Sequence, residues 1–480
     1  MLDKLFQLSE RGTTVKTEIL AGITTFITMA YILFLAPNIL SLGGMDKDAV
    51  LIATALGGGL VTIAMGLFVN YPIALAPGVG LLAFYSFTVV LGMGVSWQTA
   101  LGAVFISGLV FLVLTLTSIR QMIVEGIPAS MKVAITVGIG LFIAIIGLKL
   151  SGLMAISISL SPNSLGQVVQ THGNLVPPAS EALLTLGNLH SGETLLALFS
   201  LIFTALLMAR KIQGSLLIGV AVTTILSYAT GLSTMPENFT VLAVPDFSKA
   251  AFLQLDIPGA LHMGLITIIF SFTFVELFDS MGTLIGTATE AKIADPKSGK
   301  FPGLGKAMTV DAIGVSAGAL LGTSTITAFV ESAAGVGAGG RTGLTAVTTG
   351  VLFLICLFLA PLVSLVPNAA TSPVLIIVGA LMLGAIRNID FDDWTEGFPA
   401  FLVIVLMPFT YSIANGISAG LIAYPLLKII AGRAKEVNWI MYVLAVLVII
   451  RYVFFKLIYT HNDAISESYF IFDNYTITNT

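Results

Sequence analysis

Charged residues are scarce in this chain. Asp, Glu, Lys and Arg make up 10% of its 480 residues, whereas an ordinary soluble protein has about 25%. Apolar residues make up 56%, and the mean hydropathy is +1.01. So few charges cannot cover the surface of a soluble protein, and the same composition excludes a disordered or collagen-like chain. The composition therefore predicts an all-α polytopic membrane protein, in which about 20 apolar residues form each span.

The chain also lacks the usual signs of a catalytic or metal site. Its one cysteine, Cys356, lies in an apolar run, so no disulfide can form within the chain. The four histidines do not cluster, and no Walker loop follows a strand. We therefore expect no cofactor, no metal site and no enzymatic activity. The net charge of −4, without a basic block, does not indicate nucleic acid as a partner.

Fourteen apolar runs are candidates for membrane spans. A fifteenth stretch, 437–458, carries Arg451 and Lys456, and the sequence leaves open whether it crosses the membrane or lies at its surface. The fourteen runs lie near 17–36, 50–69, 72–91, 98–118, 130–149, 193–209, 214–233, 261–288, 308–322, 324–339, 345–366, 373–386, 399–414 and 416–432.

Lysine and arginine gather in alternate connections between these runs. With fourteen spans, the basic residues before the first run and those at 210–211, 292–306 and 433–435 all fall on one side of the membrane. The long connection 150–192 has no Lys or Arg and falls on the other side. Basic loops stay on the cytoplasmic side. The pattern therefore predicts an integral protein of the cell membrane with a cytoplasmic N-terminus.

The two halves of the chain resemble each other weakly. The segment 76–80, APGVG, matches 334–337, AGVG, at an offset of 257, and Gly57 matches Gly314 at the same offset. A chance match of Gly-rich segments is the alternative. A repeat of seven spans, an odd number, predicts two halves inserted in opposite orientations, as in secondary transporters.

The third span of each half is interrupted. The segments 72–84 and 324–338 carry Pro or Gly at mid-depth, where a lipid-facing helix would be continuous. Paired breaks in corresponding spans indicate a transport site, with the N-termini of the half-helices directed at the solute. Simple kinking for close helix packing is the alternative interpretation.

Acidic residues lie inside several predicted spans. Glu276, Asp279 and Thr283 share one helix face, and Glu331 lies beside the second break. A carboxylate at the bilayer centre costs about 2.5–3.5 kcal/mol by the lower estimates. No Lys or Arg within these spans offers an ion pair. We therefore expect these acids to face a cavity, accept hydrogen bonds or take up protons, although one or more could instead tie helices together.

Two further acids have weaker indications of function. Asp311 opens the ninth run near Lys306, and we expect it to have a structural role. Glu18 precedes most of the first run, and we expect it to lie at the membrane edge.

Four motifs resemble the nucleobase–cation symporter 2 (nucleobase/ascorbate transporter) family, in its AzgA-like purine permease branch. The resemblance covers nearly the whole chain and is most specific in the last motif. The motifs are RGTTVKTEILAGITTFITMAYILF at 11–34, ALAPGVGLLAF at 74–84, ELFDSMGTLIG at 276–286 and GTSTITAFVESAAGVGAGGRTGLTA at 322–346.

The resemblance implies a fold of fourteen spans in two inverted seven-helix repeats, with spans 3 and 10 broken. Residues 1–118 (spans 1–4) and 234–366 (spans 8–11) would form a core domain. Residues 119–233 (spans 5–7) and 367–480 (spans 12–14 and the tail) would form a gate domain. A homodimer joined through the gate domains is an assembly that the resemblance allows.

The resemblance also assigns site residues. Asp279 and Glu331 match the family's substrate acids and are the candidates for proton coupling. Leu82 and Ala36 stand where the branch usually has Asn, which puts the usual base preference in doubt. The full candidate set for substrate binding is Asp279, Glu331, Glu276, Phe84, Gly80, Ser332 and Thr283.

The activity implied is uptake of a free purine base (hypoxanthine, guanine or adenine) by proton symport with alternating access. The partners would be the purine base and the lipid bilayer, and the only coupling species would be the proton. Two alternatives remain: a symporter for xanthine or uracil on the same fold, and a passive facilitator or channel. An anionic substrate is disfavoured, because Asp279 and Glu331 would repel it.

Overall fold

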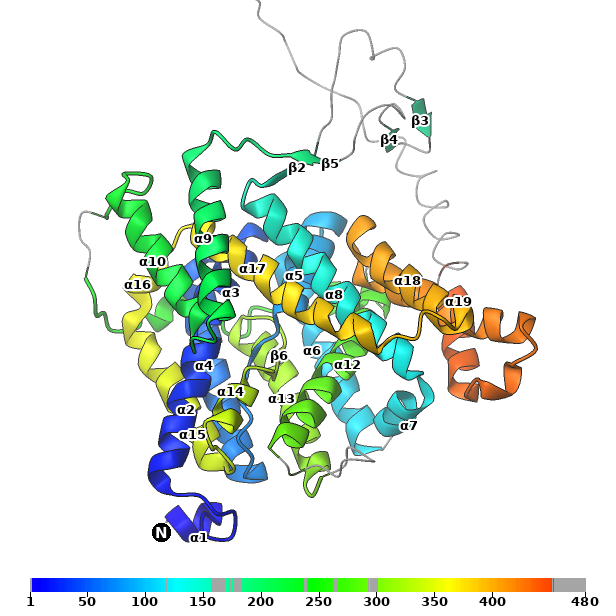
Figure 1. The fold of residues 1–480 in the computed structure, drawn as a ribbon, viewed down its shortest axis with the longest axis horizontal. Helices are drawn as coiled ribbons and strands as arrows, with labels where there is room; N and C mark the ends of the chain where they lie inside the picture. The colour runs from blue at the N-terminus through cyan, green and yellow to red at the C-terminus, as the bar shows by residue number, and fades with distance from the viewer. Residues whose placement is uncertain are drawn as a thin grey trace, which may run out of the picture.

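The computed structural model describes residues 2–117, 119–156, 169–171, 174–176, 184–236, 240–262, 266–291, 293, 301–450 and 452. Its described part is mostly helical, and ten of its helices are long and apolar enough to cross a membrane (Figure 1). Helix or half-helix occupies each of the fourteen predicted runs. The predicted all-α polytopic membrane fold is therefore confirmed.

The elements within the predicted spans follow the chain in order. They are α2 (Val15–Met29) with α3 (Ile32–Leu42), α4 (Lys47–Ala64), β1 (Leu75–Pro77) with α5 (Val79–Ala83) and the π-helix η2 (Phe84–Gly92), α6 (Trp97–Leu116), α8 (Ala129–Leu150), α9 (Gly192–Ala209), α10 (Ser215–Ala229), α12 (Ile266–Glu290), α13 (Leu304–Leu321), β6 (Ile326–Ala328) with α14 (Ser332–Gly337), α15 (Gly343–Ile355), α17 (Asn368–Leu383), α18 (Trp394–Phe409) and α19 (Ile413–Ile430).

Shorter elements lie between these spans. The fifteenth stretch contains a helix over Trp439–Ile450, and residues 451 and 453–458 lie outside the described residues, so the prediction for this stretch is left open. The connecting elements used below are α7 (Ile119–Gly126), the paired strands β2 (Met154–Ile156) and β5 (Leu184–Leu186), and the 3₁₀ turn η6 (Ala434–Glu436).

Short polar residues and glycine set where several helices begin and end. The side chains of Asp46 and Ser96 accept hydrogen bonds from backbone N–H groups in the first turns of α4 and α6, as helix N-caps do. Gly322 ends α13 with a φ of +93°, a conformation that favours glycine. This turn directs the chain into β6.

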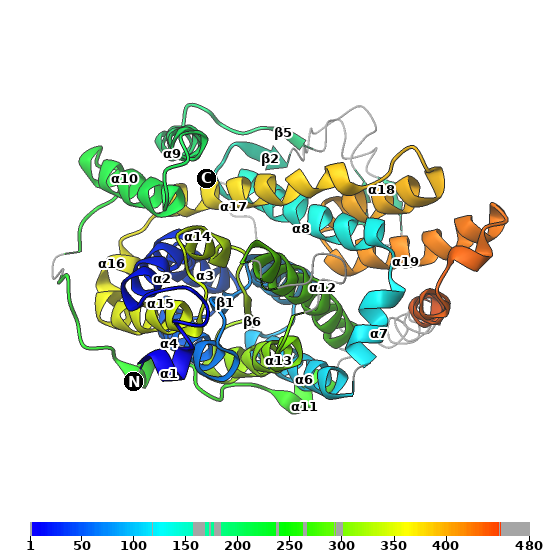
Figure 2. The same cartoon turned by 60° about the horizontal axis from the view of Figure 1, so that its bottom comes forward.

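The helices pack in two groups, which lie one above the other in Figure 2. In one group, α15 packs against α2 and α4, and α13 packs against α6. In the other, α8 packs against α17 and α18, and α17 also contacts α9 and α10. Helix α12 contacts both groups, through α6 on one side and α8 on the other.

The two broken spans pair with each other at the centre of the molecule. β1 and β6 form a two-stranded antiparallel sheet with Leu75 opposite Ala328 and Pro77 opposite Ile326. Antiparallel pairing is what two equivalent segments in an inverted repeat require. Each strand satisfies backbone groups of the other, so the breaks leave fewer unpaired polar groups in the membrane.

The repeat alignment is correct for spans 2 and 9 but not for the breaks. α4 runs over 47–64 and α13 over 304–321, which agrees with the predicted offset of 257. β6, however, begins 251 positions after β1, and α14 begins 253 positions after α5. The matched glycine segments therefore do not occupy equivalent places, because the turn between strand and helix is longer in the second half.

Glu18 lies in the first turn of α2, and its position at the membrane edge stays a prediction. Its side chain is fully buried, and its carboxylate accepts hydrogen bonds from the N–H groups of Arg341 (2.8 Å) and Thr342 (3.2 Å). The hydroxyl of Thr345 donates to the same carboxylate at 2.6 Å. Glu18 therefore fixes α2 to the first turn of α15 and stabilises the N-terminus of that helix.

We predict that Glu18→Ala lowers the free energy of unfolding by about 2–5 kcal/mol, because it leaves buried donors at the start of α15 without an acceptor. The same change at the exposed Glu10 is the matched control and should have little effect. Thermal unfolding of both purified variants in detergent measures the difference. Equal unfolding temperatures for the two variants would contradict this role of Glu18.

Candidate functional site

Asp279 lies beside the first break. It occupies the middle of α12 and is partly exposed. A Cβ atom added at Gly78, the residue between β1 and α5, would lie 3.6 Å from Oδ2 of Asp279. The same Cβ would lie 2.9 Å from Cγ2 of Thr327, so Gly78 allows the first break to pack closely against β6 beside this carboxyl group. Thr283, one helical turn further along α12, is also partly exposed.

Glu331 lies in the second break. It is the residue immediately before α14 and is partly exposed. The hydroxyl of Tyr31, which is 1% exposed, donates a hydrogen bond to Oε1 of Glu331 at 2.6 Å. Tyr31 joins α2 to α3, so the first span holds the acid of the tenth span in place.

Glu276 and Asp311 are two further acids and are more deeply buried. Glu276 is 1% exposed, and neither of its carboxyl oxygens has a hydrogen-bond partner among the described residues. Asp311 accepts hydrogen bonds from the Thr327 hydroxyl (3.2 Å), the Ala328 N–H (3.1 Å) and the Ser280 hydroxyl. The expectation that Asp311 opens its span is wrong, because α13 begins at Leu304 and places Asp311 in its middle. Its contacts support the expected structural role.

An arginine outside the predicted spans forms an ion pair with Asp311. Arg120 is fully buried, and its Nη2 lies 3.9 Å from Oδ2 of Asp311. The same nitrogen donates to the Ser280 hydroxyl at 2.8 Å. Arg120 lies on α7, in the connection between two predicted spans, so a search for bases within the spans does not find it.

The remaining predicted residues lie near the breaks but face different surroundings. Phe84 is 2% exposed and packs edge-on against Phe272 of α12, with ring centroids 4.9 Å apart. A Cβ added at Gly80 would lie 2.6 Å from Cγ2 of Ile139, so this glycine allows α5 to approach α8. The fully buried hydroxyl of Ser332 accepts a hydrogen bond from the Ala74 N–H at 3.0 Å and joins the two breaks.

Three of these placements favour structural roles. Phe84 already has an aromatic partner, and Gly80 and Ser332 hold backbone segments together. Asp279, Thr283 and Glu331 are the predicted residues that combine polar groups with partial exposure. Leu82 and Ala36, where the resemblance leads us to expect Asn, are both fully buried in the apolar core.

The half-helix N-terminus of span 10 is less open than expected. The N–H groups of Ser332, Ala333 and Ala334 each bond to the carbonyl three residues earlier, at 3.0–3.1 Å. These amides therefore have acceptors within their own turn. The polar group that this break can offer to a solute is therefore a side chain, the Glu331 carboxylate, and not these backbone amides.

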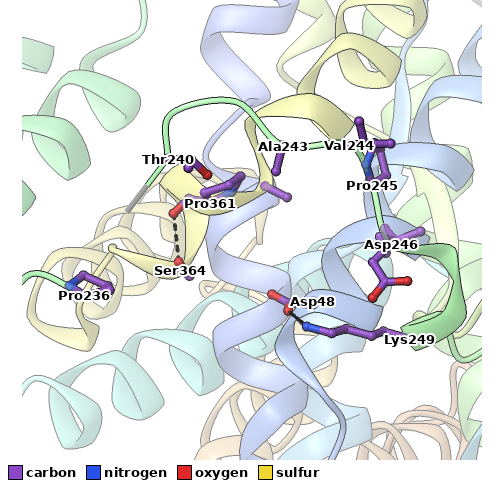
Figure 3. Close-up of a pocket in the computed structure, with 12 residues that line it drawn as sticks. Asp48, Pro236, Thr240, Ala243, Val244, Pro245, Asp246, Lys249, Pro361 and Ser364 are labelled. Atoms are coloured by element: carbon purple, nitrogen blue, oxygen red, sulfur yellow. Dashed lines mark hydrogen bonds and ion pairs between the residues drawn. The ribbon is translucent and has the colours of Figure 1, made fainter. Parts of the chain in front are cut away.

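A pocket of about 350 Å³ lies elsewhere, at the molecular surface (Figure 3). Its lining residues come from α4, from residues 236 and 240–249, and from the short helix α16 (Ala360–Ser364). Asp48 and Lys249 form an ion pair of 2.9 Å at its rim, with both side chains about half exposed. The pocket is not lined by any of the predicted site residues, and we do not assign it to the site. In the described part of the chain, no group of three or more His, Cys, Asp or Glu residues could hold a metal.

Comparisons with known proteins agree with this architecture. Residues 16–419 match the model of the Permease family, Xan_ur_permease. The adenine permease AdeP of Escherichia coli is 42% identical, over 95% of this chain and 96% of its own. The guanine/hypoxanthine permease PbuG of Bacillus subtilis is 42% identical, over 94% of this chain and 99% of its own.

A solved structure shares the fold at low sequence identity. The transmembrane domain of the cyanobacterial bicarbonate transporter BicA superposes with a TM-score of 0.58 and is 16% identical, over 84% of this chain and 97% of its own. This likeness supports the fold alone.

The geometry predicts which face of α12 reacts with a thiol reagent. Replacing Cys356 by Ser leaves a cysteine-free chain, into which Asp279→Cys, Thr283→Cys or Ser280→Cys is introduced. We expect the cysteines at 279 and 283 to react several-fold faster than the one at 280, because Ser280 is fully buried. Mass spectrometry of detergent-solubilised protein after timed labelling gives the rates. Equal or faster labelling at 280 would show that the wrong face is assigned.

Proposed function

This chain belongs to the Xan_ur_permease family of membrane transporters, and we propose that it imports free purine bases across the cell membrane in symport with protons. Relatives at 41–42% identity over most of the chain are named adenine or guanine/hypoxanthine permeases. Those names support hypoxanthine, guanine or adenine as the substrate of this chain.

The observation that carries the proposal is the placement of Asp279 and Glu331 at the two paired breaks. A purine base is flat and neutral, and its ring N–H groups are hydrogen-bond donors that a carboxylate can accept. Glu331 is partly exposed and oriented by Tyr31 at 2.6 Å. Asp279 is partly exposed and lies beside Gly78 in the first break. Two acceptors that approach from different spans can recognise one small ring without a cationic partner.

Alternating access would move a gate domain against a core domain. The packing of α8 with α17 and α18, separate from that of α13 with α6, supports the predicted grouping of the spans into two domains, whereas α7, just after residue 118, packs on α6 and α12. The proposed site lies on the core side of this division. Gly80 and Ile139 meet where α5 contacts α8, so the proposed boundary passes beside the first break.

A symporter for xanthine or uracil on the same fold is the second candidate, since Leu82 and Ala36 depart from the purine branch. Competition by unlabelled bases against labelled hypoxanthine and adenine uptake distinguishes the substrates. A passive facilitator would transport the base down its gradient without response to pH. The cytoplasmic N-terminus and a homodimer through the gate domains stay predictions.

We predict that Glu331→Gln weakens base binding about tenfold to a hundredfold, because a hydrogen bond to a charged group contributes about 1.5–3 kcal/mol. The shape of the side chain and its contact with Tyr31 are retained. Calorimetry of purified protein with each candidate base measures the affinity. Glu290→Gln, at the exposed end of α12, is the matched control. Unchanged affinity in the Glu331 variant would remove this residue from the site.

Proton coupling is tested in proteoliposomes. Wild-type protein should accumulate labelled base under an inward proton gradient and lose the accumulation with a protonophore. Asp279→Asn should uncouple uptake from pH, because an amide cannot exchange the proton. Asp279→Glu should transport weakly with some pH response retained, and Glu276→Gln should be less harmful than Asp279→Asn. Accumulation that persists with the protonophore would refute symport. A wild-type pH profile in Asp279→Asn, together with inactivity of Glu276→Gln, would move the site one helical turn.

A further inference from the structure

Two glycines of α12 have no packing partner. Most glycines in the spans make room for a neighbour: a Cβ atom added at Gly80, for example, would lie 2.6 Å from Cγ2 of Ile139. Gly282 and Gly286 are exposed, and a Cβ atom added to either would have no atom within 4 Å among the described residues. Glycine in the middle of a helix is less stable than alanine. Contacts within the described chain therefore do not explain why these two positions lack a side chain.

The exposure of α12 changes halfway along the helix. From Ile268 to Leu277 every side chain is buried or, at Phe270, partly buried. From Asp279 to the end of the helix one face is open, and it carries small or polar residues. This face consists of Asp279, Gly282, Thr283, Gly286, Thr289 and Glu290. Ionisable residues within spans face the bundle interior or a water-filled cavity, which indicates that this face borders water rather than lipid.

Gly282 lies beside Asp279 on this open face. It follows Asp279 by three positions, and residues three and four apart are neighbours on the surface of a helix. Gly286 is seven positions from Asp279, about 10 Å along the helix axis, and so lies farther along the open face. Gly282 is therefore the glycine at which a side chain would occupy the open space next to the proposed substrate acid.

The second break also adjoins open space. Val330, the residue before Glu331, is 64% exposed although its side chain is apolar. Gly337, at the end of α14, is exposed, and a Cβ atom added there would have no described atom within 4 Å. Helix α12 packs against α14. Both proposed substrate acids are thus bordered by space that the described chain leaves unfilled, on elements that contact each other.

We propose that Gly282 is a specificity-determining residue, because its missing side chain leaves room beside Asp279 for the fused second ring of a purine base. The proposal rests on the proposed function, which takes a purine base as the solute and Asp279 as one of its partners. Gly282 contributes space and not a polar contact. A larger side chain at this position would therefore exclude a base with two rings, while a smaller base with one ring still reaches the same acid.

The first test enlarges the side chain in steps. Gly282→Ala and Gly282→Leu are compared with wild-type protein by calorimetry with hypoxanthine and with uracil, which has a single ring. We expect the alanine variant to lose hypoxanthine affinity about threefold and the leucine variant about thirtyfold or more. The preference for hypoxanthine over uracil should fall by about tenfold or more in the leucine variant. Neither variant should unfold at a lower temperature than wild type, because no described atom is close enough to clash and both residues favour a helix more than glycine does.

Gly305→Leu is the matched control. Gly305 is an exposed glycine in the first turn of α13, and a Cβ atom added there also has no described atom within 4 Å. Its leucine variant adds the same volume to the start of another helix. We expect this variant to bind hypoxanthine with the affinity of wild-type protein.

Protection from a thiol reagent provides a second arm that does not depend on the leucine variant. In the Cys356→Ser background, Gly282→Cys should react with a charged methanethiosulfonate reagent, and saturating hypoxanthine should slow the reaction by about fivefold or more. Gly305→Cys should react at the same rate with and without the base. Timed labelling of detergent-solubilised protein, followed by mass spectrometry, gives both rates.

The outcomes separate this proposal from the proposed function. If wild-type protein binds no purine base, the proposed function fails first. If wild-type protein binds hypoxanthine and Gly282→Leu binds it equally well, or if hypoxanthine does not protect Gly282→Cys, the space at Gly282 is not part of the base site and this proposal is overturned. Equal losses of affinity for hypoxanthine and uracil would overturn the role of Gly282 in specificity.

Discussion

The pairing of β1 with β6 is the constraint on which the rest of this structure depends. Three residues from each broken span form an antiparallel sheet inside the membrane-spanning region. An unpaired backbone group there costs several kcal/mol, so neither break is stable without the other. The outer edges are also satisfied: the Thr62 hydroxyl exchanges hydrogen bonds with the N–H and carbonyl of Leu75 (2.8 and 2.9 Å), and Asp311 accepts from the Ala328 N–H. Spans 2 and 9 must therefore lie on either side of the breaks.

This constraint divides the acids between two tasks. Asp311 accepts a hydrogen bond from the Ala328 N–H at the edge of β6, and the buried Arg120 lies 3.9 Å from the same carboxyl group. Asp279 and Glu331 are partly exposed and adjoin the breaks. The buried acids support the backbone from behind, while the partly exposed acids remain free to meet a solute. The same local geometry thus provides both the fold's stability and the polar surface of the proposed site.

The sequence was sufficient to predict the class of fold, the two breaks and the acids near them, because each depends on a local pattern. Apolar runs determine spans, Pro and Gly interrupt them, and helical spacing places Glu276, Asp279 and Thr283 near one another. The structure separates these three further, since Glu276 is almost fully buried whereas Asp279 and Thr283 are partly exposed. Spacing alone cannot show which neighbour covers part of a helix face.

Contacts between distant segments could not be predicted. Tyr31 and Glu331 are 300 positions apart, and Arg120 lies in a polar connection that appears unrelated to the acids. Nothing in the local sequence identifies the partners of Glu18 at the start of α15. The repeat alignment failed at the breaks for a related reason: identical glycines were matched, although the turns that they occupy differ in length.

These placements also bear on selectivity. The loss of Asn at Leu82 and Ala36 suggests a changed site when the sequence alone is considered. Both side chains are fully buried in the apolar core, and the N–H of Leu82 bonds the carbonyl of Gly78 at 2.8 Å within the helix. An apolar residue at either position therefore leaves the Asp279 and Glu331 carboxylates and the Tyr31 hydroxyl in place. Discrimination among bases would then depend on how the ring N–H donors of each base match these oxygens. A wrong base that leaves a buried acceptor without a donor loses more binding free energy than one that loses an apolar contact.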